Sequence, residues 1–171
     1  MIDPRRRGKS IVGMVVGCAM LASAPALNAA TDTTTFTVSA SIVDSCDVQA
    51  TNLAFGTYSP SSNTAHNGTS TISVYCTVGT GYSLGLDVGS GGGVYNARKM
   101  TSGGSELLYN LYTSAARTTV WGDGTASTGT VSGSGAGLLS AVSHTVYGQI
   151  GINQDSAPGA YASTITVTLT F

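Results

Sequence analysis

Apolar and polar residues alternate along most of the chain from Thr33 to its last residue. A period of two is typical of strands that bury one face, because successive side chains of a strand point to opposite sides of the sheet. Segment 71–76 shows it clearly, since Ile72, Val74 and Cys76 alternate with Thr, Ser and Tyr. No segment carries the apolar stripe that an amphipathic helix requires. The same alternation predicts further half-buried strands over residues 35–42, 82–88, 142–152 and 164–171.

Turn-forming residues separate these segments, and glycine supplies 23 of the 171 residues. We interpret Asn67-Gly68 as a hairpin turn, in preference to the glycosylation site that Asn67-Gly68-Thr69 also matches. The Gly- and Ser-rich stretches 89–93 and 127–140 are interpreted as loops, because neither flank alone is long enough to hold a core. The length suits one module, and the spacing predicts an all-β sandwich of about six to eight strands.

The first 30 residues have the pattern of a secretory signal peptide. Residues 1–9 are basic, residues 11–21 are apolar and uncharged, and small residues follow at a suitable cleavage site near residues 29–30. A retained membrane anchor is one alternative, but polar residues interrupt the run short of the length that a span needs. Lipid attachment at Cys18 is another. We expect an exported chain with no membrane insertion after the signal peptide is cleaved.

Cysteine usage agrees with export. If Cys18 leaves with the signal peptide, Cys46 and Cys76 remain as an even pair in a compartment where disulfides persist. We expect these two residues to form a disulfide, with two buried free thiols as the alternative. The isolated histidines His66 and His144 show no metal-ligand spacing, so no metal is expected.

Charge is distributed unevenly along the chain. Four of the seven Lys and Arg residues lie in the first ten positions, which leaves three basic residues against seven acidic ones from Asp32 onward. A nucleic-acid-binding surface normally requires a basic patch, so no nucleic-acid partner is expected.

Motifs that could support catalysis are weak. Residues 81–85 match Gly-x-Ser-x-Gly, but this motif requires a sharp turn from a strand into a helix. Here Ser83 lies in the middle of an alternating segment with no helix after it. The acidic residues are scattered singly, which gives no paired-carboxylate site. We expect neither an enzyme nor a cofactor.

Several short stretches, taken in order, resemble the spore coat protein U domain family, which includes pilins of the archaic chaperone–usher pathway. The resemblance covers essentially Thr33 to Phe171, and its specificity lies in the order and spacing of the stretches rather than in any one of them. They are Ser45-Cys46, Leu53-Ala54-Phe55-Gly56-Thr57-Tyr58, Ile72-Ser73-Val74-Tyr75-Cys76, Arg98-Lys99-Met100, Leu108-Tyr109-Asn110-Leu111-Tyr112, Thr119-Val120-Trp121-Gly122-Asp123-Gly124, Tyr147-Gly148-Gln149-Ile150 and Gly159-Ala160-Tyr161.

This resemblance implies an incomplete immunoglobulin-like β-sandwich whose missing strand comes from a neighbouring subunit. Residues 1–30 would be the signal peptide, residues 31–44 an N-terminal donor segment and residues 45–171 the pilin domain. A periplasmic chaperone would fill the gap during transit, and an outer-membrane usher would then exchange it for the donor segment of a homologous or identical pilus subunit. The product would be a cell-surface fibre, secreted through the periplasm, that serves attachment and biofilm formation.

The resemblance also assigns roles to two sets of alternating residues. The donor segment is uncharged between its two aspartates, and its inward side chains would be Phe36, Val38, Ala40 and Ile42. The last strand would border the gap that the chaperone or donor fills, with inward side chains Ile165, Val167, Leu169 and Phe171.

Three alternatives stay open from the sequence. Residues 33–42 could instead be the first strand of their own complete sandwich. The chain could be a non-polymerising component of a spore or cell coat. It could also be a small carbohydrate-binding sandwich that uses Trp121, Tyr58 or Tyr112 as a stacking platform, although Trp121 is better interpreted as a core residue beside a turn.

Overall fold

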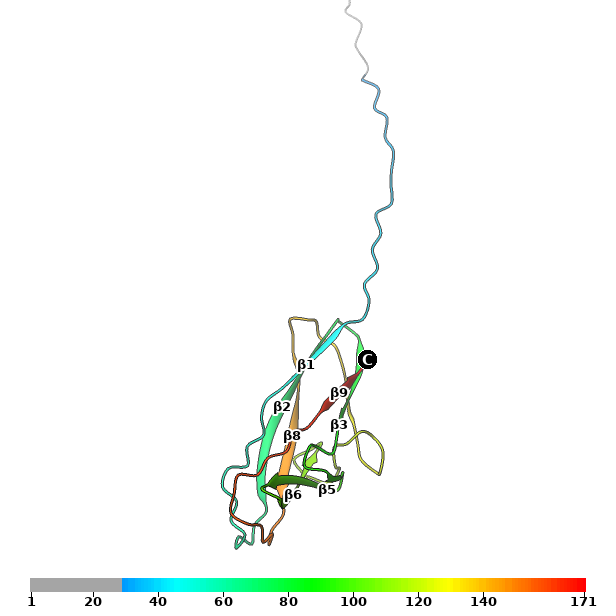
Figure 1. Ribbon diagram of the computed structural model, residues 1–171. Coiled ribbons are helices and arrows are strands. Elements are labelled where there is room, and N and C mark those ends of the chain that lie inside the picture. The colour runs from blue at the N-terminus through cyan, green and yellow to red at the C-terminus, as the bar shows by residue number, and fades with distance from the viewer. Residues whose placement is uncertain (1–28) are drawn as a thin grey trace, which may run out of the picture. The chain divides into compact units, whose positions relative to one another are not determined.

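The computed structural model describes residues 29–171, which divide into strands and loops without a helix. By contact the chain separates into two units, Met1–Ala40 and Ser41–Phe171. In the first unit the signal-peptide prediction lies almost wholly outside the described residues, and residues 29–40 form no strand. The second unit carries all the strands (Figure 1). Residues 29–171 contain no helix of the length and hydrophobicity that a membrane span requires.

The Ser41–Phe171 unit is built from two antiparallel sheets. The larger sheet has six strands in the order β1-β2-β8-β6-β5-β4, and the smaller has three in the order β7-β3-β9. The strands are β1 (Cys46–Ala50), β2 (His66–Cys76), β3 (Gly81–Leu86), β4 (Gly93–Val94), β5 (Ala97–Ser102), β6 (Ser105–Tyr112), β7 (Val131–Ser134), β8 (Val142–Ile150) and β9 (Val167–Thr170).

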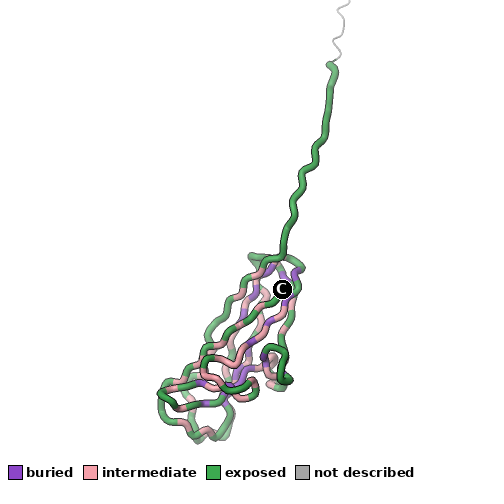
Figure 2. The backbone as a smooth tube through the Cα atoms, turned by 45° about the vertical axis from the view of Figure 1, so that its right-hand side comes forward, coloured by how far each residue is buried: buried purple, intermediate pink, exposed green. Residues whose placement is uncertain are grey.

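One core lies between the two sheets. Ile72 and Val74 of β2 and Leu84 and Leu86 of β3 are at most 2% exposed, and they belong to the same apolar cluster. The alternation that predicted strands at 71–76 and 82–88 therefore also identified the inward faces correctly. Figure 2 shows the buried positions running along the strands, with exposed positions mainly in the loops.

The expected disulfide joins Cys46 and Cys76 in the structure. The two residues are direct partners in the antiparallel pairing of β1 with β2, and Cys76 is fully buried. The bond therefore ties the first strand of the domain to the core.

A buried cation connects the two sheets. Arg98 of β5 is fully buried, and its guanidinium donates to the main-chain oxygens of Asp87 at 2.9 Å and Trp121 at 2.6 Å and to Oδ1 of Asn110 at 2.9 Å. Burial lowers the pKa of Arg98. Trp121 is also fully buried and donates its indole N–H to the main-chain oxygen of Leu84. Trp121 is thus a core residue, as its position beside a turn indicated, and cannot serve as a carbohydrate-stacking platform.

The interpretation of Asn67-Gly68 as a hairpin turn is wrong. Both residues lie inside β2 and pair with Gln149 and Gly148 of β8. A Cβ atom at Gly68 would lie 3.0 Å from Leu53 Cδ2, so glycine is present here because another segment packs against the strand. The glycine that suggested a turn instead allows Leu53 and Phe55 to pack directly on β2.

Candidate functional site: a groove beside the last strand

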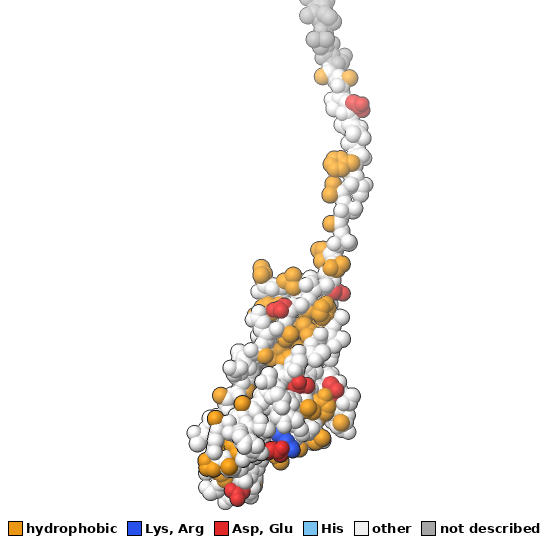
Figure 3. All heavy atoms as spheres, viewed as in Figure 1, with side chains coloured by type: hydrophobic (Ala, Val, Ile, Leu, Met, Phe, Trp, Pro, Cys, Tyr) orange, Lys and Arg blue, Asp and Glu red, His pale blue; other side chains and the backbone are white. Residues whose placement is uncertain are grey.

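A groove of about 470 Å³ opens along the Ser41–Phe171 unit. One wall runs from Ala50, the last residue of β1, to Phe55, and the other runs from Tyr161 to Val167, the first residue of β9. The floor comes from core side chains of both sheets, and none of the residues that line the groove is charged. Hydrophobic side chains gather in a band on the face of the domain that Figure 3 shows. The groove therefore suits an uncharged, apolar occupant.

The main chain of the 161–167 wall is hydrogen-bonded on one side only. The even-numbered residues 162, 164 and 166 bond to Thr101, Ser90 and Asp87 respectively. Within residues 29–171, no main-chain hydrogen bond involves residues 161, 163 or 165. Successive residues of an extended chain direct their N–H and C=O groups to opposite sides, so the odd-numbered residues present unpaired groups toward the groove.

The predicted inward residues of the last strand occupy this wall and its continuation. Ile165 and Val167 line the groove, and Leu169 is half-buried against the core. Phe171 is 58% exposed. The strand itself is shorter than predicted, because only Val167–Thr170 pairs with β3 and Ile165 lies before it. Since β9 is the edge of the three-stranded sheet, its other side is open to a further strand.

The opposite wall stands over two glycines. Gly68 and Gly148 pair across β2 and β8, and Leu53 and Phe55 lie over both of them. The main-chain oxygen of Phe55 also contacts Nε2 of His66, which holds this wall to the start of β2. The β1–β2 pairing holds the start of this wall at Ala50 and Thr51, and packing and side chains hold the rest of it.

Tyr109 lies across the floor of the groove. Its ring meets the ring of Phe55 edge-on with 6.3 Å between centroids. At its other end, the hydroxyl and Ser163 Oγ lie 3.1 and 2.5 Å from the position that a Cβ atom at Gly89 would occupy. Burial raises the pKa of Tyr109, so the phenol stays neutral at physiological pH. Tyr109 therefore spans the groove from wall to wall.

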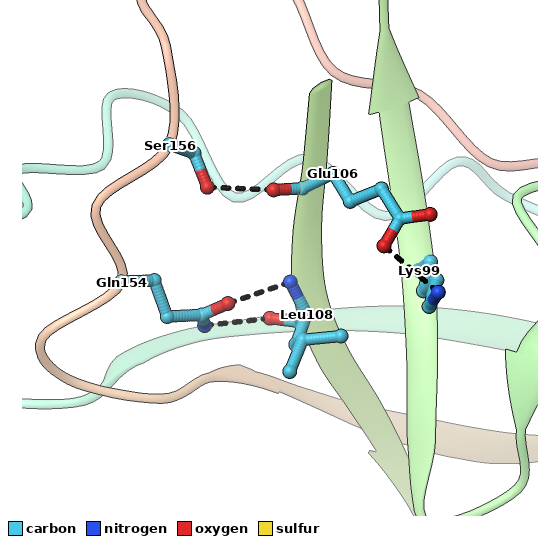
Figure 4. A network of polar contacts seen from close by, with 5 residues as sticks. All are labelled: Lys99, Glu106, Leu108, Gln154 and Ser156. Atoms are coloured by element: carbon cyan, nitrogen blue, oxygen red, sulfur yellow. Dashed lines mark hydrogen bonds and ion pairs between the residues drawn. The ribbon is translucent and has the colours of Figure 1, made fainter. Parts of the chain in front are cut away.

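A second hollow of about 630 Å³ adjoins the groove and shares Leu53, Phe55, Met100 and Tyr161 with it. The loop that follows β8 forms part of its rim. The side-chain amide of Gln154 bonds to both main-chain groups of Leu108: Oε1 accepts from the Leu108 N–H at 2.6 Å, and Nε2 donates to the Leu108 oxygen at 2.8 Å (Figure 4). A neighbouring strand would make the same pair of bonds.

The same rim is held at two further points. Ser156 donates to the main-chain oxygen of Glu106 at 2.6 Å (Figure 4). The hydroxyl of Tyr58 donates to the oxygen of Gly151 at 3.0 Å and accepts from the N–H of Gln154 at 3.1 Å. Hydrogen bonds to β6 and to Tyr58 therefore hold the loop that borders the second hollow.

The predicted donor residues lie outside the groove lining, which comes from the Ser41–Phe171 unit alone. Phe36, Val38 and Ile42 are 87%, 82% and 91% exposed, and residues 29–45 form neither helix nor strand. The structure thus brings together the predicted residues of the last strand but not those of the donor segment.

Two groove residues were missed as site residues by the sequence analysis. Tyr109 and Phe55 appeared only inside stretches that carried the family resemblance. The sequence did contain a signal for Phe55, because Gly68 and Gly148 lie inside strands, and a glycine within a strand often marks the close approach of another segment. Residues 29–171 contain no cluster of side chains that could hold a metal ion.

Comparisons with known proteins give a family and a fold. A family model described as the Spore Coat Protein U domain matches residues 32–168. No curated protein matches the chain. The chain is similar, with a TM-score of 0.56 and 21% identity, to a chain in the crystal structure of the CsuC-CsuE chaperone-tip adhesion subunit pre-assembly complex from archaic chaperone-usher Csu pili of Acinetobacter baumannii. The match covers 76% of this chain and 40% of that chain. The predicted all-β, immunoglobulin-like fold is confirmed, and its completion by another chain stays a prediction.

Proposed function

The chain belongs to the spore coat protein U domain family, and from this membership and the open groove we propose that it is a structural subunit of an extracellular fibre of the archaic chaperone–usher type. Its role is structural rather than catalytic. The observation that carries the proposal is the groove, whose 161–167 wall has unpaired main-chain groups along an apolar, uncharged hollow. A strand inserted there would pair with that wall and cover the core.

The occupant in the fibre is the donor segment, residues 31–44, of the next subunit. Between its two aspartates the segment carries no charge, and Phe36, Val38, Ala40 and Ile42 alternate with Thr and Ser. Four inward side chains can fill a groove while the polar residues between them face water. The pilin domain, residues 45–171, receives the donor of its own neighbour in the same way.

Before assembly the groove needs a temporary occupant. An unpaired edge beside exposed apolar side chains invites aggregation, so a periplasmic chaperone supplies the strand until an outer-membrane usher exchanges it for the donor segment. The signal peptide, residues 1–30, directs the chain to the periplasm. The fibre is displayed on the cell surface, where attachment and biofilm formation are its function.

A truncation separates binding of the chaperone from assembly into a fibre. A variant without residues 31–42 should co-purify with the chaperone, since its groove is intact, but should form no fibre. The matched control keeps the length of the segment and replaces Phe36, Val38, Ala40 and Ile42 by serine; it should behave like the truncation. A mature full-length chain that stays a stable monomer without any partner would contradict the proposal, because it would indicate a complete sandwich.

A further inference from the structure

We propose that the outer face of the six-stranded sheet, which points away from the core, binds an acidic polysaccharide at Tyr112, Tyr147 and Arg117. None of these three residues lines the groove or the second hollow. The inference therefore goes beyond the proposed function, since it gives the chain a ligand on a surface that the donor segment does not need.

Two tyrosines lie next to each other on this face. Tyr112 of β6 and Tyr147 of β8 are direct partners in the antiparallel pairing of these strands, so their side chains project on the same side. Both are half-buried, whereas Leu111 and Gly148, which pair next to them, are buried on the core side. A tyrosine side chain combines an apolar ring with a polar hydroxyl. This combination suits a sugar, which has an apolar C–H face and hydroxyl groups at its edge.

The loop that follows β6, residues 113–119, places Arg117 over this pair. The guanidinium carbon lies 5.9 Å from the centre of the Tyr147 ring, which is a cation–π distance. Nη1 donates to the main-chain oxygen of Ala115 at 3.0 Å, and no other hydrogen bond within residues 29–171 involves this guanidinium. Nη2 is therefore free to bind a ligand beside the two rings.

Arg117 is held in an unfavourable conformation. Its φ is 52°, in the left-handed region that residues other than glycine rarely adopt. Its Nε atom is buried and has no hydrogen-bond partner within residues 29–171, although buried polar groups normally have one. Strained residues concentrate at functional sites. These two costs indicate that the position of the guanidinium serves binding rather than stability.

The charge of Arg117 is not compensated by an acidic side chain in the described part of the chain. Of the three Lys and Arg residues within residues 29–171, Arg98 is buried, Lys99 forms an ion pair with Glu106, and Arg117 forms none. Guanidinium groups form strong, charge-assisted hydrogen bonds with carboxylates. The site therefore matches a sugar that carries a carboxylate.

The number of charges defines the polymer further. Each chain offers one such guanidinium, whereas seven acidic residues lie from Asp32 onward. These acidic residues would repel a densely charged polyanion, but a polymer whose carboxylates are separated by neutral sugars can meet one guanidinium at a time. A fibre repeats the site in every subunit, so a repeating polymer would gain avidity from many weak contacts. The ligand is therefore a polysaccharide in which acidic and neutral sugars alternate.

Hyaluronan, in which acidic and neutral sugars alternate, is the probe that tests the site. Its binding to purified fibres is measured at about 0.15 M salt, where the Debye length is about 8 Å and distant charges are screened. Arg117→Gln and Tyr112→Leu should each weaken binding by about tenfold or more, since arginine and tyrosine side chains dominate binding surfaces. Arg117→Lys, which keeps the charge but loses the planar guanidinium, should weaken binding by about threefold.

Two variants on the same outer face are matched controls. Lys99→Gln removes a charge and Tyr75→Leu removes a half-buried tyrosine, and both side chains alternate with buried residues of their strands. Each should change the affinity by less than about twofold, because neither lies at the site. Equal losses from Arg117→Gln and Lys99→Gln, or from Tyr112→Leu and Tyr75→Leu, would overturn the inference. Thermal melting checks the fold of each variant, and Arg117→Lys decides the outcome if Arg117→Gln is destabilised.

Two other polymers test the class of ligand. Dextran, which is uncharged, and heparin, which is densely charged, should each bind about tenfold more weakly than hyaluronan. Equal or tighter binding of either polymer, or no binding of hyaluronan, would overturn the inference and leave the fibre subunit standing, since the site lies outside the groove. Absence of fibres from the unmodified chain would overturn the proposed function instead, and the same measurements on the mature chain would then decide the site.

Discussion

Gly68 and Gly148 face one another across β2 and β8, and the side chains of Leu53 and Phe55 fill the space above both. A Cβ atom at Gly148 would lie 2.7 Å from Leu53 and 2.8 Å from Phe55, closer than atoms can pack. The pair of glycines therefore allows one wall of the groove to lie directly on the six-stranded sheet.

This contact predicts the effect of a single methyl group. Gly148→Ala should push Leu53 and Phe55 away from the sheet and lower the free energy of unfolding by about 1–3 kcal/mol. The measurement is thermal melting of purified fibres. Gly81→Ala is the control, because a Cβ atom there meets nothing within 4 Å. Equal melting temperatures for the two variants would show that the wall does not depend on the glycine pair.

Arg98 gives a second prediction, since its guanidinium donates to three oxygen atoms. Arg98→Met leaves the main-chain oxygens of Asp87 and Trp121 without this donor, whereas Asn110 Oδ1 keeps the N–H of Leu111. Two unsatisfied acceptors should lower the free energy of unfolding by about 2–5 kcal/mol. Lys99→Met in the same strand is the control: its ion pair with Glu106 at 2.8 Å is partly exposed, so about 1 kcal/mol or less should be lost. A similar loss in both variants would contradict a structural role for the buried cation.

The disulfide gives a third prediction. It closes a separation of 30 residues between Cys46 and Cys76, and on chain-entropy grounds its removal should cost about 3–4 kcal/mol. The double variant Cys46→Ala and Cys76→Ala should accumulate less chaperone-bound subunit in the periplasm. Mass spectrometry of peptides prepared without reductant checks the bond itself; free thiols at both positions would contradict it.

The fold class and many of the buried residues could be predicted from the sequence alone. Strands that bury one face, such as β2 and β3, show their alternation directly. β6 was not predicted from periodicity, because Leu108 is apolar although exposed, and Tyr109, Asn110 and Leu111 are buried in succession. A period-two rule cannot detect such a strand.

The groove was harder to predict than the strands. Its 161–167 wall could be anticipated from alternating residues such as Ile165 and Val167. The opposite wall could not, because Leu53 and Phe55 belong to an irregular segment placed by long-range packing on Gly68 and Gly148. Local pattern carries no information about such a contact until the strands are paired.

The central claim is that residues 36–42 of one subunit are the strand inserted into the next, and two neighbouring substitutions test it. Val38→Asp would place an unpaired charge in an apolar groove at a cost of several kcal/mol, whereas Thr37→Asp points to the other face. The measurement is the amount of fibre on the cell surface by electron microscopy, with the periplasmic subunit level as the control for export and chaperone capture. The account predicts that fibres are lost with Val38→Asp and retained with Thr37→Asp. Equal fibre yields from both variants would contradict it.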